Sequence, residues 1–333
     1  MTRVVADSIA ARSDLASRAK PKRTRVQLFL PIADIPVNIF LILAMGAAVG
    51  FVSGMFGIGG GFLMTPLLIF IGISPGVAVA SVSSHIAASS FSGALSYWRR
   101  RAIDPALAGV LLGGGIVGTF FGVWLFTLLR KVGQLDLMIA LSYVVLLSSV
   151  GGLMFWEGAR ALLRARRGDI LPTRRARAQG WILGLPMKVR FKRSKIYLSV
   201  IPIAGVGLTI GFLGAIMGIG GGFLLVPIMI YVLRIPTATV IGTSMVLTLV
   251  TMMVATVLHA TTNHLVDAVL ALVLMAGGVV GAQFGARAGQ KIRSEHLRLL
   301  LGLLILSVGI RFAIQLVVSP DELYSIREVG AGG

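Results

Sequence analysis

Eight long apolar runs most constrain how this chain can fold. Each is close to the ~20 residues that an α-helix needs to cross the hydrocarbon core of a bilayer. Charged residues make up only 13% of the chain, against roughly a quarter in an ordinary soluble domain. The pattern predicts an all-α fold, a polytopic bundle of transmembrane helices. The runs are residues 36–56, 76–98, 105–126, 137–156, 196–217, 237–258, 266–286 and 299–318.

The chain also contains an internal duplication. The segments "GFVSGMFGIGGGFLMTPLLIF" (50–70) and "GFLGAIMGIGGGFLLVPIMIY" (211–231) are identical at 11 of 21 positions, at an offset of 161. Residues 104–122 and 267–285 align in the same way at an offset of 163. We therefore expect two homologous four-span repeats. Many transporters are built from such repeats and bind their substrate at the repeat interface.

The placement of basic residues predicts a topology. The first 30 residues hold seven Lys or Arg, and residues 157–195 hold 12; the positive-inside rule places such segments in the cytoplasm. Four spans in each copy would then leave both termini cytoplasmic and make the copies parallel. The predicted parts of this multi-pass protein of the cytoplasmic membrane are a basic cytoplasmic tail (1–35), repeat 1 (36–156), a basic cytoplasmic linker (157–195), repeat 2 (196–318) and a cytoplasmic C-terminal tail (319–333).

The net charge of +19 does not require a nucleic-acid partner, because the basic clusters flank membrane spans. We expect the basic linker to contact anionic lipids. The expected partners are thus a small anionic substrate and these lipids, with no nucleic acid, and a homodimer stays open.

A glycine-rich "GIGGG" interrupts the first apolar run of each copy. Each glycine costs a helix interior about 1 kcal/mol relative to alanine, so four close together predict a break. We expect one helix to end near Met55 and a second to begin near Phe62, with Pro66 and Pro227 in first helical turns. Free amides and the positive end of the second helix would then bind an anion. The predicted backbone donors are Gly57, Gly59, Gly60, Gly61, Gly218, Gly220, Gly221 and Gly222.

The alternative for these glycines is close helix packing, as in small-xxx-small interfaces. We favour packing for the later glycines of residues 113–118 and 277–281, because they lie in continuous helical runs.

Polar side chains follow each glycine tract. Ser83 and Ser244 are equivalent positions, and we expect them to donate to the anion together with Ser84, His85 and Thr243. Two alternatives stay open: hydroxyls in spans often bond carbonyls of their own helix, and His85 either takes up a proton in symport or makes a structural interhelical hydrogen bond. His259 and His264 are predicted to lie in a solvated turn.

Acidic residues are informative by their positions. No Asp or Glu falls in the middle of a span, which disfavours a cationic substrate. Asp104 and Asp267 stand where spans begin and are expected to cap helices. Metal-ligand spacing, nucleophile–base pairs and nucleotide-binding loops are not apparent, so we expect no metal, no cofactor and no enzymatic activity.

Two copies of G-x-G-G-G-F-L-x-x-P, each followed by a further proline and then by "ASVSS" (80–84) or "IGTSM" (241–245), resemble the sulfite exporter TauE/SafE family of permeases. The resemblance covers residues ~36–318. It implies transport of sulfur oxyanions or small organosulfonates. The sequence thus predicts a secondary transporter that works by alternating access around the broken helices; an anion channel with the same donors is the alternative.

Overall fold

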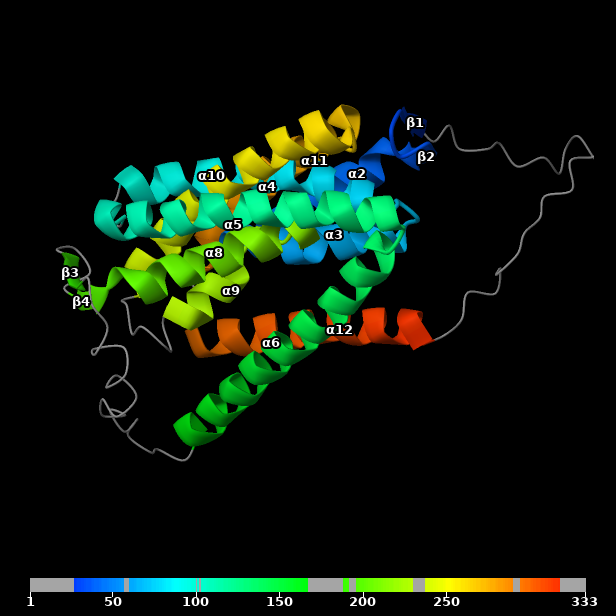
Figure 1. Cartoon of the computed structure of the whole chain (residues 1–333). Coiled ribbons are helices and arrows are strands. Elements are labelled where there is room, and N and C mark those ends of the chain that lie inside the picture. The colour runs from blue at the N-terminus through cyan, green and yellow to red at the C-terminus, as the bar shows by residue number, and fades with distance from the viewer. Residues whose placement is uncertain are drawn as a thin grey trace, which may run out of the picture.

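The computed structural model describes residues 27–56, 60–99, 101, 103–166, 188–191, 196–229, 237–289 and 294–317. It is a bundle of helices with two short β-hairpins (Figure 1), which confirms the predicted helical class. Within these residues, six helices are long and apolar enough to cross a membrane, whereas the sequence predicts eight spans. The helix Pro75–Arg99 is not among the six, and the last helix has a shorter apolar part, Leu299–Ile314.

The two halves of the chain present their elements in the same order. The first half consists of β1 (Gln27–Leu30), β2 (Ile35–Asn38), α2 (Ile39–Phe56), α3 (Gly61–Phe70), α4 (Pro75–Arg99), α5 (Pro105–Val132) and α6 (Leu135–Arg166). The second half consists of β3 (Lys188–Phe191), β4 (Ile196–Ser199), α8 (Val200–Met217), α9 (Gly222–Pro227), α10 (Thr237–Leu258), the π-helix η2 (His259–Asn263), α11 (Ala268–Gly289) and α12 (Ser294–Val317).

The ends of the helices gather at two opposite ends of the bundle. At the β1–β2 end, on the right in Figure 1, the Asp267 carboxylate before α11 accepts a hydrogen bond from the Ile32 amide at 3.0 Å. Gly76, at the start of α4, faces Leu265 and Leu135 at the same end. The opposite β3–β4 end holds the start of α8 and the last turns of α6.

Glycines set the directions in which paired helices run. A Cβ on Gly46 would meet the backbone of Leu274, and one on Gly54 that of Ala282, so α2 and α11 run parallel. Gly114 faces Ala204 and Gly122 faces Phe212, so α5 and α8 also run parallel. Small residues of this kind allow close backbone contact between membrane helices.

The later glycines of the duplicated segments behave as predicted. A Cβ on Gly114, Gly118, Gly277 or Gly281 would collide with the backbone of a facing helix. Of the glycines in residues 113–118 and 277–281, Gly113 has open space where a Cβ would lie. The packing interpretation is therefore confirmed for the others.

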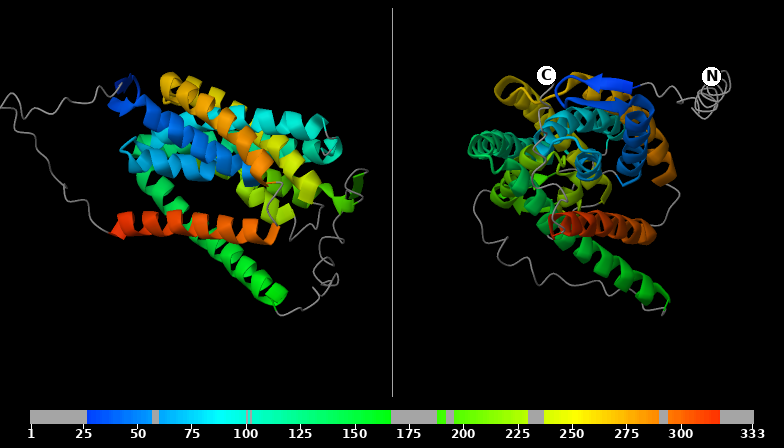
Figure 2. Two further views of the ribbon diagram at one scale, coloured as in Figure 1. Left: turned by 180° about the vertical axis from the view of Figure 1, so that it is seen from behind. Right: turned by 90° about the vertical axis from the view of Figure 1, so that its right-hand side faces the viewer.

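Helices α6 and α12 form a third pair, which runs antiparallel. Gly151 of α6 faces Leu306 and Gly158 faces Leu299. Figure 2 shows this pair (green and orange-red) lying beside the remaining helices.

Each glycine tract reverses the direction of the chain. Gly61, the first residue of α3, faces Ile86 in the middle of α4. The ring of Phe70, at the other end of α3, lies 5.0 Å from Phe312 near the end of α12. Helix α3 therefore runs from the middle of the bundle back to the β1–β2 end, where α2 begins. Helix α9 likewise turns back towards the β3–β4 end, since Leu225 packs with Leu107 and Val240.

This reversal corrects the predicted topology. The expectation that residues 36–70 cross once and leave the membrane near Ser74 is wrong, because α3 returns to the end where α2 begins. The β1–β2 hairpin and the end of α12 lie at one end, while the end of α6 and β3–β4 lie at the other (Figure 1). The described elements next to the two tails, β1 and α12, thus reach the end opposite to β3–β4, whereas the sequence predicts one side for both tails and the linker.

The parallel relation of the copies is wrong for the same reason. Helix α5 runs towards the β1–β2 end and α11, its counterpart in the duplicated sequence, runs away from it. The prediction from basic residues assumed that every apolar run crosses the whole bundle. A glycine break instead lets one run reach the middle of the bundle and turn back.

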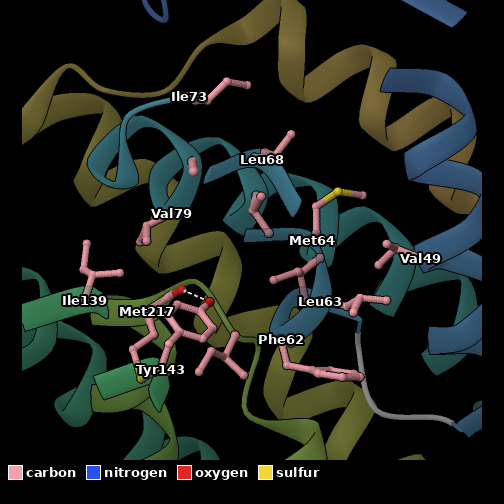
Figure 3. Packing of buried hydrophobic residues seen from close by; sticks show 14 of the residues in the cluster. Val49, Phe62, Leu63, Met64, Leu68, Ile73, Val79, Ile139, Tyr143 and Met217 are labelled. Carbon is pink, nitrogen blue, oxygen red and sulfur yellow. Dashed lines mark hydrogen bonds between the residues drawn. The ribbon is translucent and has the colours of Figure 1, made fainter. Parts of the chain in front are cut away.

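The core lies around α3, which is buried along almost its whole length. Figure 3 shows Phe62, Met64 and Leu68 of α3 packed among side chains of α2, α4 and α6. The outer faces of α5 and α11 instead expose large apolar side chains, including Phe120, Trp124 and Leu272. Such surfaces fit contact with lipid.

The two aspartates cap helices as predicted. The Asp104 carboxylate accepts from the Ala106 amide at 3.2 Å at the start of α5. Asp267 accepts from the Leu270 amide at 3.0 Å at the start of α11. Its second oxygen holds the β1–β2 turn at Ile32, so one carboxylate fixes two elements.

Candidate functional site

The two glycine breaks meet in the interior of the bundle. A Cβ on Gly61 would lie 2.6 Å from the carbonyl oxygen of Gly218 and 2.8 Å from that of Ile219. All the predicted glycines that the structure describes are buried: Gly60, Gly61, Gly218, Gly220, Gly221 and Gly222. Gly57 and Gly59 lie outside the described residues.

The two breaks share one backbone conformation. Gly60 has φ 65° and ψ −13° at the start of α3, and its counterpart Gly221 has φ 63° and ψ −18° at the start of α9. Residues with a side chain rarely adopt this left-handed region of backbone conformation. The predicted helix break is thus present twice: α2 ends at Phe56 and α3 begins at Gly61.

The prolines lie deeper than expected. Pro66 is the sixth residue of α3, beyond the first turn, and Pro227 is the sixth and last residue of α9.

Three hydroxyl groups donate to backbone carbonyls at and just after the end of α8. Tyr143 of α6 donates to Met217 at 2.6 Å, Thr65 of α3 donates to Gly218 at 3.3 Å, and Thr248 of α10 donates to Gly220 at 2.6 Å. The dashed line in Figure 3 marks the first of these bonds. Carbonyls left over at a helix end normally need such partners.

Backbone amides of the first break lie beside these carbonyls. The amides of Leu63 and Met64 donate to the Gly60 carbonyl at 3.2 and 3.3 Å. The N-terminus of α3 places partial positive charge at the centre of the bundle.

The serines that the sequence places at the site bond to their own helices. Ser83 donates to the Val79 carbonyl at 2.9 Å, Ser84 to Ser81 at 2.6 Å, and Ser244 to Ile241 at 2.8 Å. This is the local alternative that the sequence analysis left open.

The structure does not bring Ser83 and Ser244 together. Helices α4 and α10 run antiparallel, and Gly93 of α4 faces Met245, the neighbour of Ser244. Gly93 stands ten residues beyond Ser83, about 15 Å along a helix. One small anion does not reach both hydroxyls in this arrangement.

His85 joins two helices. Its Nδ1 lies 2.8 Å from the Leu274 carbonyl of α11, and its ring packs on Gly278. Thr243 is fully buried, and its hydroxyl has no hydrogen-bond partner within the described residues. Leu247, one turn further along α10, faces Gly115 of α5, so Thr243 lies towards α5 and away from the glycine breaks.

His259 is not solvated, contrary to the prediction. It is buried, its Nε2 lies 3.1 Å from the Ala215 carbonyl, and its ring packs edge-on against Phe126. The π-helix η2 turns it inward, whereas His264 is exposed as expected.

Sequence reasoning missed Tyr143 and Thr65. Thr65 lies within the duplicated motif, four residues after Gly61, so its position offered a signal. Tyr143 lies in the apolar run 137–156, where no sequence pattern marks it. Only the packing of α6 shows that its hydroxyl reaches the Met217 carbonyl. Across the described residues, no group of His, Asp and Glu is arranged to hold a metal ion.

Comparisons with known proteins place the chain among membrane transporters. The family model "Sulfite exporter TauE/SafE" matches residues 42–312. The probable membrane transporter protein YjnA of Bacillus subtilis is 26% identical over 81% of this chain and 98% of its own length. A probable membrane transporter protein of Xylella fastidiosa is 28% identical over 82% of this chain and 94% of its own length.

A shorter match is with the Sulfite exporter TauE/SafE family protein 1 of Arabidopsis thaliana, 42% identical over 60 residues, which is 18% of this chain and 13% of that relative. No solved structure matches the chain. The family match covers both glycine breaks and the helices that enclose them. The chain therefore belongs to the sulfite exporter TauE/SafE family of membrane transporters.

Proposed function

We propose that this protein is a secondary carrier for a small anion, and that it acts by binding and conformational change without enzymatic chemistry. The anion binds where the two glycine breaks meet. The observation that carries the proposal is the meeting of two buried breaks, where hydroxyls donate to the carbonyls of Met217, Gly218 and Gly220 and the N-terminus of α3 begins.

The proposed substrate class is a sulfur oxyanion or a small organosulfonate. This class rests on the family description, sulfite exporter, and on the name of the Arabidopsis relative. It agrees with the chemistry of the site, since oxyanions accept hydrogen bonds from backbone amides at helix N-termini.

The proposed mechanism is alternating access between two homologous repeats, each with a glycine-broken first element. Opposite directions of α5 and α11 are what an inverted repeat requires, and inverted repeats can rock about a site held at their interface. The helix that begins each half packs on the third apolar run of the other half: α2 packs on α11, and α8 packs on α5. Rocking would therefore move these pairs as units.

The proposed orientation places the β3–β4 end in the cytoplasm. Residues 157–195 run from the last turns of α6 to the start of β4, and they hold 12 Lys or Arg; Arg99 ends α4 and Arg101 precedes α5. The positive-inside rule then favours this end over the β1–β2 end. The linker, of which residues 167–187 and 192–195 lie outside the described part, remains the proposed contact for anionic lipids.

Flux measurements in proteoliposomes test the proposal. Protein reconstituted with internal sulfite should take up labelled sulfite faster than protein in empty liposomes, because a carrier shows trans-stimulation. Acetate and chloride inside should not substitute. Saturable uptake without trans-stimulation would favour the channel alternative, and no anion flux above protein-free liposomes would refute both.

A further inference from the structure

One buried hydroxyl near the glycine breaks has no protein partner. The Ser90 side chain is 1% exposed, and within the described residues its oxygen makes no hydrogen bond. Buried hydroxyls are normally paired, so each exception calls for an explanation such as a ligand.

Ser90 lies on the face of α4 that meets the breaks. Ile86, four residues earlier, contacts Gly61 of the first glycine tract and Gly220 of the second. Gly93, three residues later, contacts Met245 of α10. Residues spaced by three or four share one face of a helix, so Ser90 points from α4 into the space between α3 and α10.

The start of α3 is directed towards the same space. Helix α3 runs to the β1–β2 end, so its first amides, including that of Gly61, point towards the β3–β4 end. Helix α4 runs towards the β3–β4 end, and Ser90 lies on that side of Ile86 by one turn, about 6 Å. The unpartnered Ser90 hydroxyl therefore lies on the side of the breaks towards which the N-terminus of α3 points.

The corresponding residues of the second half differ. Thr251 stands at the position equivalent to Ser90, offset by 161. Its hydroxyl lies 2.8 Å from the Leu247 carbonyl and 3.3 Å from that of Thr248. Ser89, the neighbour of Ser90, donates to the Ile86 carbonyl at 3.0 Å. Ser90 is thus distinguished from both its counterpart and its neighbour.

We propose that the Ser90 hydroxyl and the positive N-terminal end of α3 at Gly61 form an oxyanion subsite, which makes Ser90 a specificity-determining residue. The subsite rests on the proposed function, and it places the stronger half-site in the first repeat. A hydroxyl beside backbone amides favours an anion with several acceptor oxygens over a halide of equal charge.

The test compares Ser90→Ala with Ser89→Ala in the purified full-length protein. Sulfite, methanesulfonate and chloride are the probes, and their dissociation constants are measured by calorimetry and by the ligand-dependent rise in melting temperature. Ser90→Ala should weaken sulfite about 10-fold or more, as loss of a hydrogen bond to a charged group does. Chloride affinity should change less than twofold, and Ser89→Ala should leave sulfite affinity within about twofold of wild type.

The melting temperature without anion separates ligand binding from structure. Because the Ser90 hydroxyl has no protein partner, Ser90→Ala should melt at or above the wild-type temperature; Ser90→Gly serves as a second variant that also removes the oxygen. Wild-type sulfite binding with unchanged affinity in Ser90→Ala would overturn the subsite alone. Absence of binding of every oxyanion probe by the wild type would overturn the proposed function with it.

Discussion

The Tyr143 hydroxyl donates to the Met217 carbonyl at 2.6 Å and so ties α6 to the last residue of α8. The glycine break begins at the next residue, Gly218, which has φ 65°. The Tyr143 ring also stacks on Phe312 at 5.3 Å between centroids. One side chain therefore links the α6–α12 pair to the site where the breaks meet.

Tyr143→Phe should destabilise the protein by about 1–3 kcal/mol, because it leaves the buried Met217 carbonyl without its donor while the ring stack is kept. Denaturant titration in detergent micelles measures the change. Tyr143→Ala is the matched variant and should cost more, since it removes the ring as well. Equal stability of Tyr143→Phe and wild type would show that this bond contributes nothing.

Gly61→Ala should abolish transport and destabilise the fold by about 3 kcal/mol, since the added methyl would meet the carbonyls of Gly218 and Ile219, which cannot yield. Gly113→Ala is the control. A Cβ there has open space within α5, so alanine should stabilise the helix by about 0.5–1 kcal/mol. Melting curves and sulfite uptake report both variants; a functional Gly61→Ala protein would contradict the close contact of the breaks.

Sequence reasoning worked where a residue type has a local consequence. Glycines in an apolar run predict a break wherever they stand, and Asp104 and Asp267 cap α5 and α11 because a carboxylate at a helix start finds free amides. Both effects depend on a few neighbouring residues.

Sequence reasoning failed where the fold depends on the direction that the chain takes after a glycine break. Whether the chain goes on or turns back after Gly60 is decided by packing of α3 against α4 and α12, which no local pattern records. That turn reverses the second half relative to the first, so equivalent residues such as Ser83 and Ser244 lie apart. The prediction that such equivalent residues share one anion site depended on the two copies being parallel.

His85→Gln tests whether the imidazole couples protons or joins helices. The ring lies against Gly278 and bonds the Leu274 carbonyl, so the substitution should destabilise the protein by about 1–3 kcal/mol. The pH profile of sulfite uptake should keep its shape, because the ring faces α11 and not the glycine breaks. A profile that loses a titration step in His85→Gln would establish the coupling role instead.

Single-cysteine labelling tests the orientation and the reversal together. The chain has no cysteine, so each introduced thiol reports one position without background. Gln134→Cys lies between α5 and α6 at the β1–β2 end, and Val189→Cys lies in β3; both positions are exposed. In intact cells, a membrane-impermeant maleimide should label Gln134→Cys and spare Val189→Cys, and inverted vesicles should give the opposite pattern, because positive charge retains the β3–β4 end inside. Exchange of the two patterns would refute only the orientation. Labelling of both from one side would contradict the crossing of α6 between the two ends, on which the inverted arrangement depends.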